Sequence, residues 1–77
     1  MNKKRKKAIA KSMEQIRDIC EEIAVIQEEE QEYFDNMPEN LQGSERGMES
    51  ESVIDVLANT IGDLESVAET LEAIAEE

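Results

Sequence analysis

The chain has 77 residues, of which 20 are acidic and 8 are basic, giving a net charge of -12. A chain of this length buries little surface by itself, so association with a partner is an option from the start. The sequence has no histidine and 1 cysteine, which excludes an intramolecular disulfide, the usual zinc ligand sets and histidine-based acid–base catalysis. No apolar run reaches the length needed to span a bilayer. We expect a cytoplasmic protein that is not an enzyme, with no catalytic residue, metal or cofactor.

The chain begins with a basic segment. The first seventeen residues carry a net charge of +6 and the remaining sixty carry -18. The run "KKRKK", which contains Lys4, Arg5 and Lys7, is either a frayed, solubilising end or a segment that binds phosphate groups or touches a membrane. The acidic body would repel a phosphate backbone, so we expect no direct binding of nucleic acid, and no membrane partner.

The first predicted helix covers residues 3–35. Its apolar residues Ile9, Met13, Ile16, Cys20 and Ile23 are spaced 4, 3, 4 and 3 apart, which is typical of one face of a helix. Ile19 and Ile26 form an adjacent stripe, so the apolar face is wide. No glycine or proline interrupts this segment.

A connecting segment is predicted over residues 36–49, within the stretch "YFDNMPENLQGSERGMESES". It is longer than a connection between two helices usually needs, and it contains the only proline. One interpretation is structural: the aromatic and apolar side chains plug the open end of the helix pair. These side chains are Tyr33, Phe34, Met37, Leu41 and Met48.

The other interpretation is a ligand site. Arg46 is the only basic residue outside the N-terminal segment. It is either a salt-bridge anchor for neighbouring glutamates or, beside amides and an aromatic ring, a group that holds a small anion. The candidate ligand-binding residues are Tyr33, Asn36, Asn40, Gln42, Ser44 and Arg46, together with Lys4, Arg5 and Lys7 of the basic segment.

The second long helix is predicted over residues 50–76, with Ser50 or Ser52 as its N-terminal cap. Its apolar residues step regularly by 3 and 4: Ile54, Leu57, Ile61, Leu64, Ala68, Leu71 and Ala75. Val53, Val56, Thr60, Val67 and Ile74 flank this stripe. Gly62 is either a point of close approach between helices or a tolerated surface glycine, at a cost of about 1 kcal/mol relative to alanine.

These elements predict an all-α fold, an antiparallel hairpin of two helices that associates into a helical bundle. One hairpin cannot cover two wide apolar faces, so we expect a homodimer or a larger assembly. A mobile monomer or a host partner that covers the second stripe is the alternative. The predicted oligomer interface consists of Ile16, Ile19, Ile23, Ile26, Val53, Leu57, Ile61, Leu64 and Leu71.

The connecting segment and the acidic helix after it resemble small helical proteins of bacteriophages and prophages, in which a DNMPENLQGSERG-type loop joins two helices. The resemblance covers about residues 29–77 and implies a setting, without an activity. It suggests a phage protein that acts on a host defence system by sequestering a small nucleotide-like signal. The alternatives are an acidic decoy that binds a host protein as a nucleic-acid mimic, and a structural or assembly protein of the phage.

Overall fold

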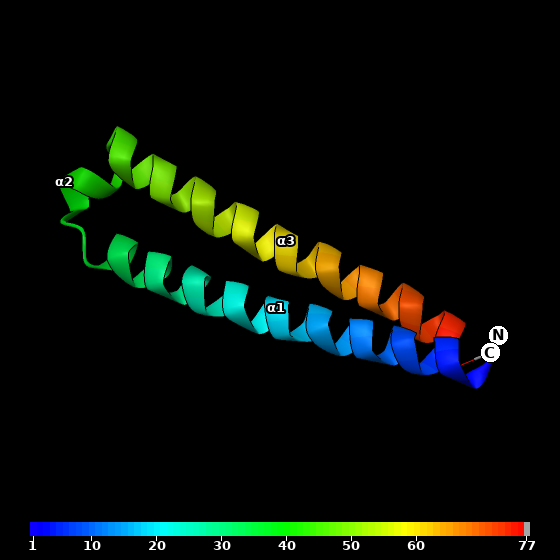
Figure 1. Ribbon diagram of the computed structural model, residues 1–77. Coiled ribbons are helices and arrows are strands. Elements are labelled where there is room, and N and C mark those ends of the chain that lie inside the picture. Colours follow the sequence, from blue (N-terminus) through cyan, green and yellow to red (C-terminus); the bar gives the residue numbers. More distant parts are fainter. Residues whose placement is uncertain (77) are drawn as a thin grey trace.

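The computed structural model describes residues 1–76 and consists of two long helices and a short one. Helix α1 covers Lys3–Asp35, α2 covers Glu39–Gln42 and α3 covers Glu45–Ala75. No strand occurs in residues 1–76, so the predicted all-α class is confirmed. Helices α1 and α3 lie side by side and run in opposite directions, which brings the N-terminus and the end of α3 together (Figure 1). The Cα atoms extend over 58 × 15 × 12 Å, so the molecule is a thin rod.

Helix α1 has the predicted bounds because local residues cap its start and stop it at its end. Asn2 is the N-cap, and its side chain accepts a hydrogen bond of 2.9 Å from the backbone N–H of Arg5. Asn36 is the C-cap, and Pro38, which cannot continue a helix, follows two residues later. The sequence between these signals has no helix breaker.

Helix α3 begins five residues earlier than the sequence predicts. Ser44 is its N-cap, so the prediction of Ser50 or Ser52 in this role is wrong. The apolar pattern continues backwards from Ile54 through Ser50 to Gly47, in steps of 4 and 3, and both residues are buried. Packing of these small residues against α1 and α2 extends the helix. The connection between the long helices therefore shortens to residues 36–44, and α2 lies within it.

The two long helices meet along a continuous line of side chains that we call the seam. Its positions step by 3 and 4 along both helices, as in antiparallel coiled-coil packing. On α1 they are Ile9, Met13, Ile16, Cys20, Ile23, Gln27, Glu30 and Phe34, and on α3 they are Gly47, Ser50, Ile54, Leu57, Ile61, Leu64, Ala68, Leu71 and Ala75. Most are only half-buried. Within residues 1–76 the buried apolar side chains are Met13, Cys20, Met37 and Ala68, which are 2% to 9% exposed, so the core is thin.

Two glycines differ in what surrounds them. A Cβ added at Gly62 would meet nothing within 4 Å, so the interpretation of Gly62 as a close-approach point is wrong and the surface alternative is correct. The close approach between two helices is at Gly47 instead. A Cβ there would overlap the carbonyl oxygen of Gln42 and lie 2.6 Å from that of Leu41. The backbone of α2 thus passes directly over Gly47.

No helix within residues 1–76 combines the length and the apolar character that a membrane crossing requires.

Candidate ligand site at the turn end

The turn end of the rod, residues 33–50, gathers six of the predicted site residues around α2. Tyr33 lies in the last turns of α1, and Asn36 caps that helix. Asn40 is exposed in α2. Gln42 and Ser44 are used locally: Gln42 Nε2 donates to the carbonyl oxygen of Phe34 at 3.1 Å, and the Ser44 hydroxyl donates to that of Leu41. The structure therefore gives Gln42 and Ser44 a positioning role, because they fix α2 between the long helices.

Tyr33 and Arg46 lie between two adjoining hollows of the surface. The first is mainly apolar, and its other lining residues are Asn36, Met37, Pro38 and Leu41. The second is lined also by Glu30, Glu49, Ser50 and Val53. A phenol ring and a guanidinium shared by two hollows form a surface on which a flat aromatic group could stack and an anionic group could bind.

Ser50 supplies an unusual polar group to the second hollow. The residue is 3% exposed, and its hydroxyl has no hydrogen-bond partner. A buried hydroxyl without a partner costs free energy, and buried polar groups are paired in most proteins. Since Ser50 lines the hollow that Arg46 and Tyr33 also line, a ligand there would be near a donor that the fold itself leaves unused.

Arg46 is free to meet a ligand. The only ion pair in residues 1–76 joins Arg17 Nη2 to Glu72 Oε2 at 3.3 Å, far along the rod. The interpretation of Arg46 as a salt-bridge anchor is therefore wrong. The carboxylates of Glu30 and Glu49 line the same hollow and oppose an anion there, and Glu30 is half-buried at the seam.

Only two of the five predicted plug residues are buried or half-buried at the turn end. Met37 is buried at 8% exposure and Phe34 is half-buried, and together they close the turn end between the helices. Tyr33, Leu41 and Met48 remain 49%, 39% and 61% exposed, so their predicted role as plug residues is wrong. Tyr33 and Leu41 line the first hollow instead.

Lys4, Arg5 and Lys7 are exposed in the first turns of α1, at the opposite end of the rod. Within one chain the structure does not bring them near Arg46. The predicted set of ligand residues is therefore divided between the two ends of the molecule (Figure 1).

The predicted oligomer interface also divides into two groups. Ile16, Ile23, Leu57, Ile61, Leu64 and Leu71 are half-buried at the seam, where they hold α1 to α3 within the chain. Ile19, Ile26 and Val53 are 45%, 52% and 38% exposed and remain available to a partner. The first group already packs within the chain, so only the surface that the seam leaves exposed could contact a second copy, and its place in an interface between chains stays a prediction.

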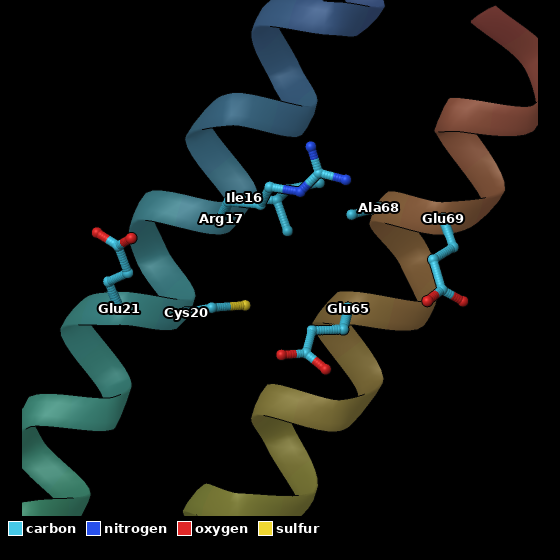
Figure 2. A pocket seen from close by; sticks show the side chains of 7 residues that line it. All are labelled: Ile16, Arg17, Cys20, Glu21, Glu65, Ala68 and Glu69. Atoms are coloured by element: carbon cyan, nitrogen blue, oxygen red, sulfur yellow. The ribbon is translucent and has the colours of Figure 1, made fainter. Parts of the chain in front are cut away.

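A third hollow lies midway along the rod, on the other side of the seam. Figure 2 shows the Cys20 thiol pointing from α1 towards α3, across from Glu65, with Ile16, Arg17 and Ala68 above it. Cys20 is buried and unoxidised. Residues 1–76 contain no group of three or more His, Cys, Asp or Glu side chains placed to hold a metal ion, and this hollow is accounted for by the seam and the Arg17–Glu72 ion pair.

Sequence reasoning missed Ser50, Pro38 and Val53 as lining residues of the two hollows. A signal for Ser50 was present, because the steps of 3 and 4 that end at Ile54 place Ser50 and Gly47 at earlier seam positions. Serine before an apolar run is also a common capping pattern, and that local pattern obscured the longer one.

Comparison of the chain with protein-family models, with curated proteins and with solved structures gave no match.

Proposed function

We propose that this chain is a non-enzymatic binding protein whose turn end binds a small anionic, nucleotide-like ligand. The observation that carries the proposal is the unpaired, buried hydroxyl of Ser50 beside Arg46 and Tyr33. In this proposal α1 and α3 form a stable antiparallel hairpin that associates with a second copy. The setting that best fits the resemblance of its loop is a bacteriophage protein in the host cytoplasm, where sequestering a nucleotide signal would counteract a host defence system.

The chemistry of the site suits the parts of a nucleotide. The Tyr33 ring, 49% exposed, offers a face for stacking of a base, and the mainly apolar first hollow adjoins it. Arg46 offers several N–H donors and a permanent positive charge to a phosphate group. The Ser50 hydroxyl is buried beneath the second hollow, so it would be a further donor to a ligand that displaces the side chains covering it. A non-enzymatic role is proposed because these groups bind and orient, and none of them is placed as a nucleophile beside a base.

Calorimetric titration with the four ribonucleoside monophosphates and with cyclic AMP tests this proposal. We expect at least one to bind, and Arg46→Ala to weaken binding by about 1.5 to 3 kcal/mol, the usual contribution of a charge-assisted hydrogen bond. Arg17→Ala is the matched control, since it removes an exposed arginine from the middle of the rod. Failure of all five nucleotides to bind would contradict the proposal.

Ser50→Ala separates binding from folding. Because the hydroxyl is buried and unpaired, its removal should leave the free protein as stable as before or more stable. The same substitution should weaken nucleotide binding. A parallel loss of stability and of affinity would show that Ser50 acts through the fold alone.

A second function is favoured by the charge of the turn end. Residues 28–52 contain nine carboxylates and one arginine, and Glu28 and Glu29 are fully on the surface. Such a surface can occupy a basic groove on a host protein in place of nucleic acid. Its association with a lysine-rich peptide should then be fast, fall steeply as NaCl is raised, and weaken on replacement of Glu28 and Glu29 by Gln. Binding that does not respond to salt would exclude the decoy.

A further inference from the structure

We propose that two copies of this chain pack head to tail through one side of the rod, with the turn end of each copy beside the termini of the other. The inference deepens the self-association proposed above and rests on it. The side in question contains the residues that directly precede seam residues, and its apolar members form one row. We call it the lateral apolar face: Ile19, Ile26, Tyr33, Val53, Thr60, Val67 and Ile74.

These residues lie on one side of the molecule. In an antiparallel helix pair, positions that precede the seam on both helices fall on the same side, and positions that follow it fall on the other. The described contacts agree with this assignment. Tyr33 and Val53, which precede Phe34 and Ile54, line a common hollow. Arg17 and Glu72, which follow Ile16 and Leu71, form an ion pair on the opposite side.

The two sides differ in chemistry. Six members of the lateral apolar face are between 38% and 52% exposed, although they are large and apolar or aromatic. The hydroxyl of Thr60 donates to the backbone of Val56, which leaves its methyl group for the face. The opposite side is polar and carries Arg17, Gln31, Glu51, Glu65 and Glu72. Burial of the lateral apolar face would remove aliphatic surface from water, while the charged groups of the same side, such as Arg46 and Glu49, would have to stay at its edges.

The face is organised in four levels. Tyr33 lies level with Val53, and steps of seven residues place Ile26 with Thr60, Ile19 with Val67, and Ser12 with Ile74. A head-to-tail two-fold axis between the second and third levels matches every level with one in the second copy. Ile19 then faces Ile26 of the second copy, Val67 faces its Thr60, and the small Ser12 faces its large Tyr33.

Charge selects the head-to-tail orientation. Residues 28–52, which are the turn end and the adjoining turns of α1 and α3, have a net charge of -8, whereas residues 1–17 have a net charge of +6. Packing with both turn ends at the same end would place two strongly acidic segments side by side. Head-to-tail packing instead sets each acidic turn end beside the basic first turns of the other copy, which is electrostatic complementarity at the two ends of the interface.

The face alone is smaller than an interface of standard size. Its four levels run from Ser12 to Tyr33 on α1, about 32 Å at 1.5 Å per residue, so the basic first turns and the acidic turn end must supply the rest of the roughly 800 Å² that each partner contributes. The occupant must also be long, straight and apolar in the same four-level pattern. A second copy of this chain has the same pattern because its sequence is identical.

The arrangement also completes the proposed ligand site. Residues 3–7 lie beyond Ser12, so head-to-tail packing carries them past Tyr33 of the other copy towards its Arg46 and α2. Lys4, Arg5 and Lys7, which one chain holds far from Arg46, then offset the carboxylates of Glu30 and Glu49 at the hollow of the second chain.

Disulfide trapping tests the orientation. In a Cys20→Ala background, chains with Ile19→Cys are mixed with isotope-labelled chains with Ile26→Cys, refolded together and mildly oxidised. We expect at least tenfold more mixed disulfide than from Ile19→Cys mixed with Val67→Cys, which would face each other only if both turn ends lay together. A preference for the second pair, or no disulfide from either, overturns the proposal.

A matched pair of surface substitutions tests the face itself. Ile26 and Val25 are adjacent and are 52% and 53% exposed, but only Ile26 belongs to the lateral apolar face. In sedimentation experiments at micromolar concentration, Ile26→Glu should give helical monomers and Val25→Glu should remain dimeric. A helical monomer from the unaltered chain, or equal effects of the two substitutions, contradicts the proposal. Both experiments omit nucleotides, so failure of the ligand proposal leaves their outcome unchanged.

Discussion

Single residues at the turn end decide where the second long helix begins. Gly47 has a negative φ, so its role is to make room for other atoms. The carbonyl groups of Leu41 and Gln42 occupy the space that a Cβ would need. Because these are backbone atoms, they cannot move aside as a flexible side chain could. The residue type at position 47 therefore controls whether α2 can dock on α3.

Gly47→Ala should destabilise the protein by about 1 to 3 kcal/mol, the usual cost of overpacking a close contact. The measurement is chemical denaturation followed by circular dichroism. Gly43→Ala is the control, since a Cβ at Gly43 would meet nothing within 4 Å. Equal stability of the two variants would show that α2 does not dock as the structure has it.

Gly62→Ala should act in the opposite direction. Position 62 is exposed in the interior of α3, and an added Cβ meets no atom. Alanine loses less conformational entropy than glycine in a helix, so the free energy of unfolding should rise by up to about 1 kcal/mol. Thermal unfolding of the two proteins provides the measurement. A fall in stability would mean that a neighbour approaches Gly62 after all.

At the scale of the element, α1 and α3 stabilise each other through a narrow seam. Few of its side chains are fully buried, so most of the free energy of folding comes from many half-buried contacts along the helices. A charge placed at one seam position loses hydration without gaining a partner. A charge placed at an adjacent exposed position stays in water.

Leu57→Asp should therefore unfold the helix pair at 25 °C, whereas Val56→Asp should leave its helical content nearly unchanged. Leu57 is half-buried at the seam, and Val56 is 58% exposed beside it. Far-ultraviolet circular dichroism of the two variants gives the comparison. Retained helicity in Leu57→Asp would show that α3 does not depend on α1.

In the whole molecule, the basic first turns and the acidic turn end lie at opposite ends of the rod. The row of exposed apolar residues and the more polar surface lie on opposite sides of it. A compact sphere of the same chain would mix these surfaces. The extended shape keeps the lateral apolar face away from the charged side, and it keeps the acidic turn end away from the basic first turns. These two separations together make head-to-tail pairing favourable.

Small-angle scattering should show a particle with the mass of two chains and a length close to the 58 Å extent of one. Side-by-side packing adds to the width of a rod and leaves its length nearly unchanged. A particle of about double this length would indicate association end to end and would contradict the lateral interface.

The helical class, the bounds of α1 and the heptad spacing of the seam can be predicted from the sequence, because they follow from local signals. Asn2 caps α1, Pro38 stops it, and the steps of 3 and 4 repeat without interruption. Of the polar residues predicted around Arg46, Tyr33 and Asn36 line a hollow with it, whereas Asn40, Gln42 and Ser44 line neither of the two hollows.

Which of two adjacent apolar stripes of α1 faces inward depends on packing between the helices of the folded chain. Ile16 and Ile19 fit a helical pattern equally well, and the packing of α3 against α1 places the first at the seam and leaves the second exposed. Because α2 docks on the first turn of α3, this helix begins at Glu45 and not at the predicted Ser50. The Ser50 hydroxyl is therefore buried within the helix pair, beside Arg46. Periodicity in a sequence defines a face of one helix, but the partner that covers that face is set by contacts between residues far apart in the chain.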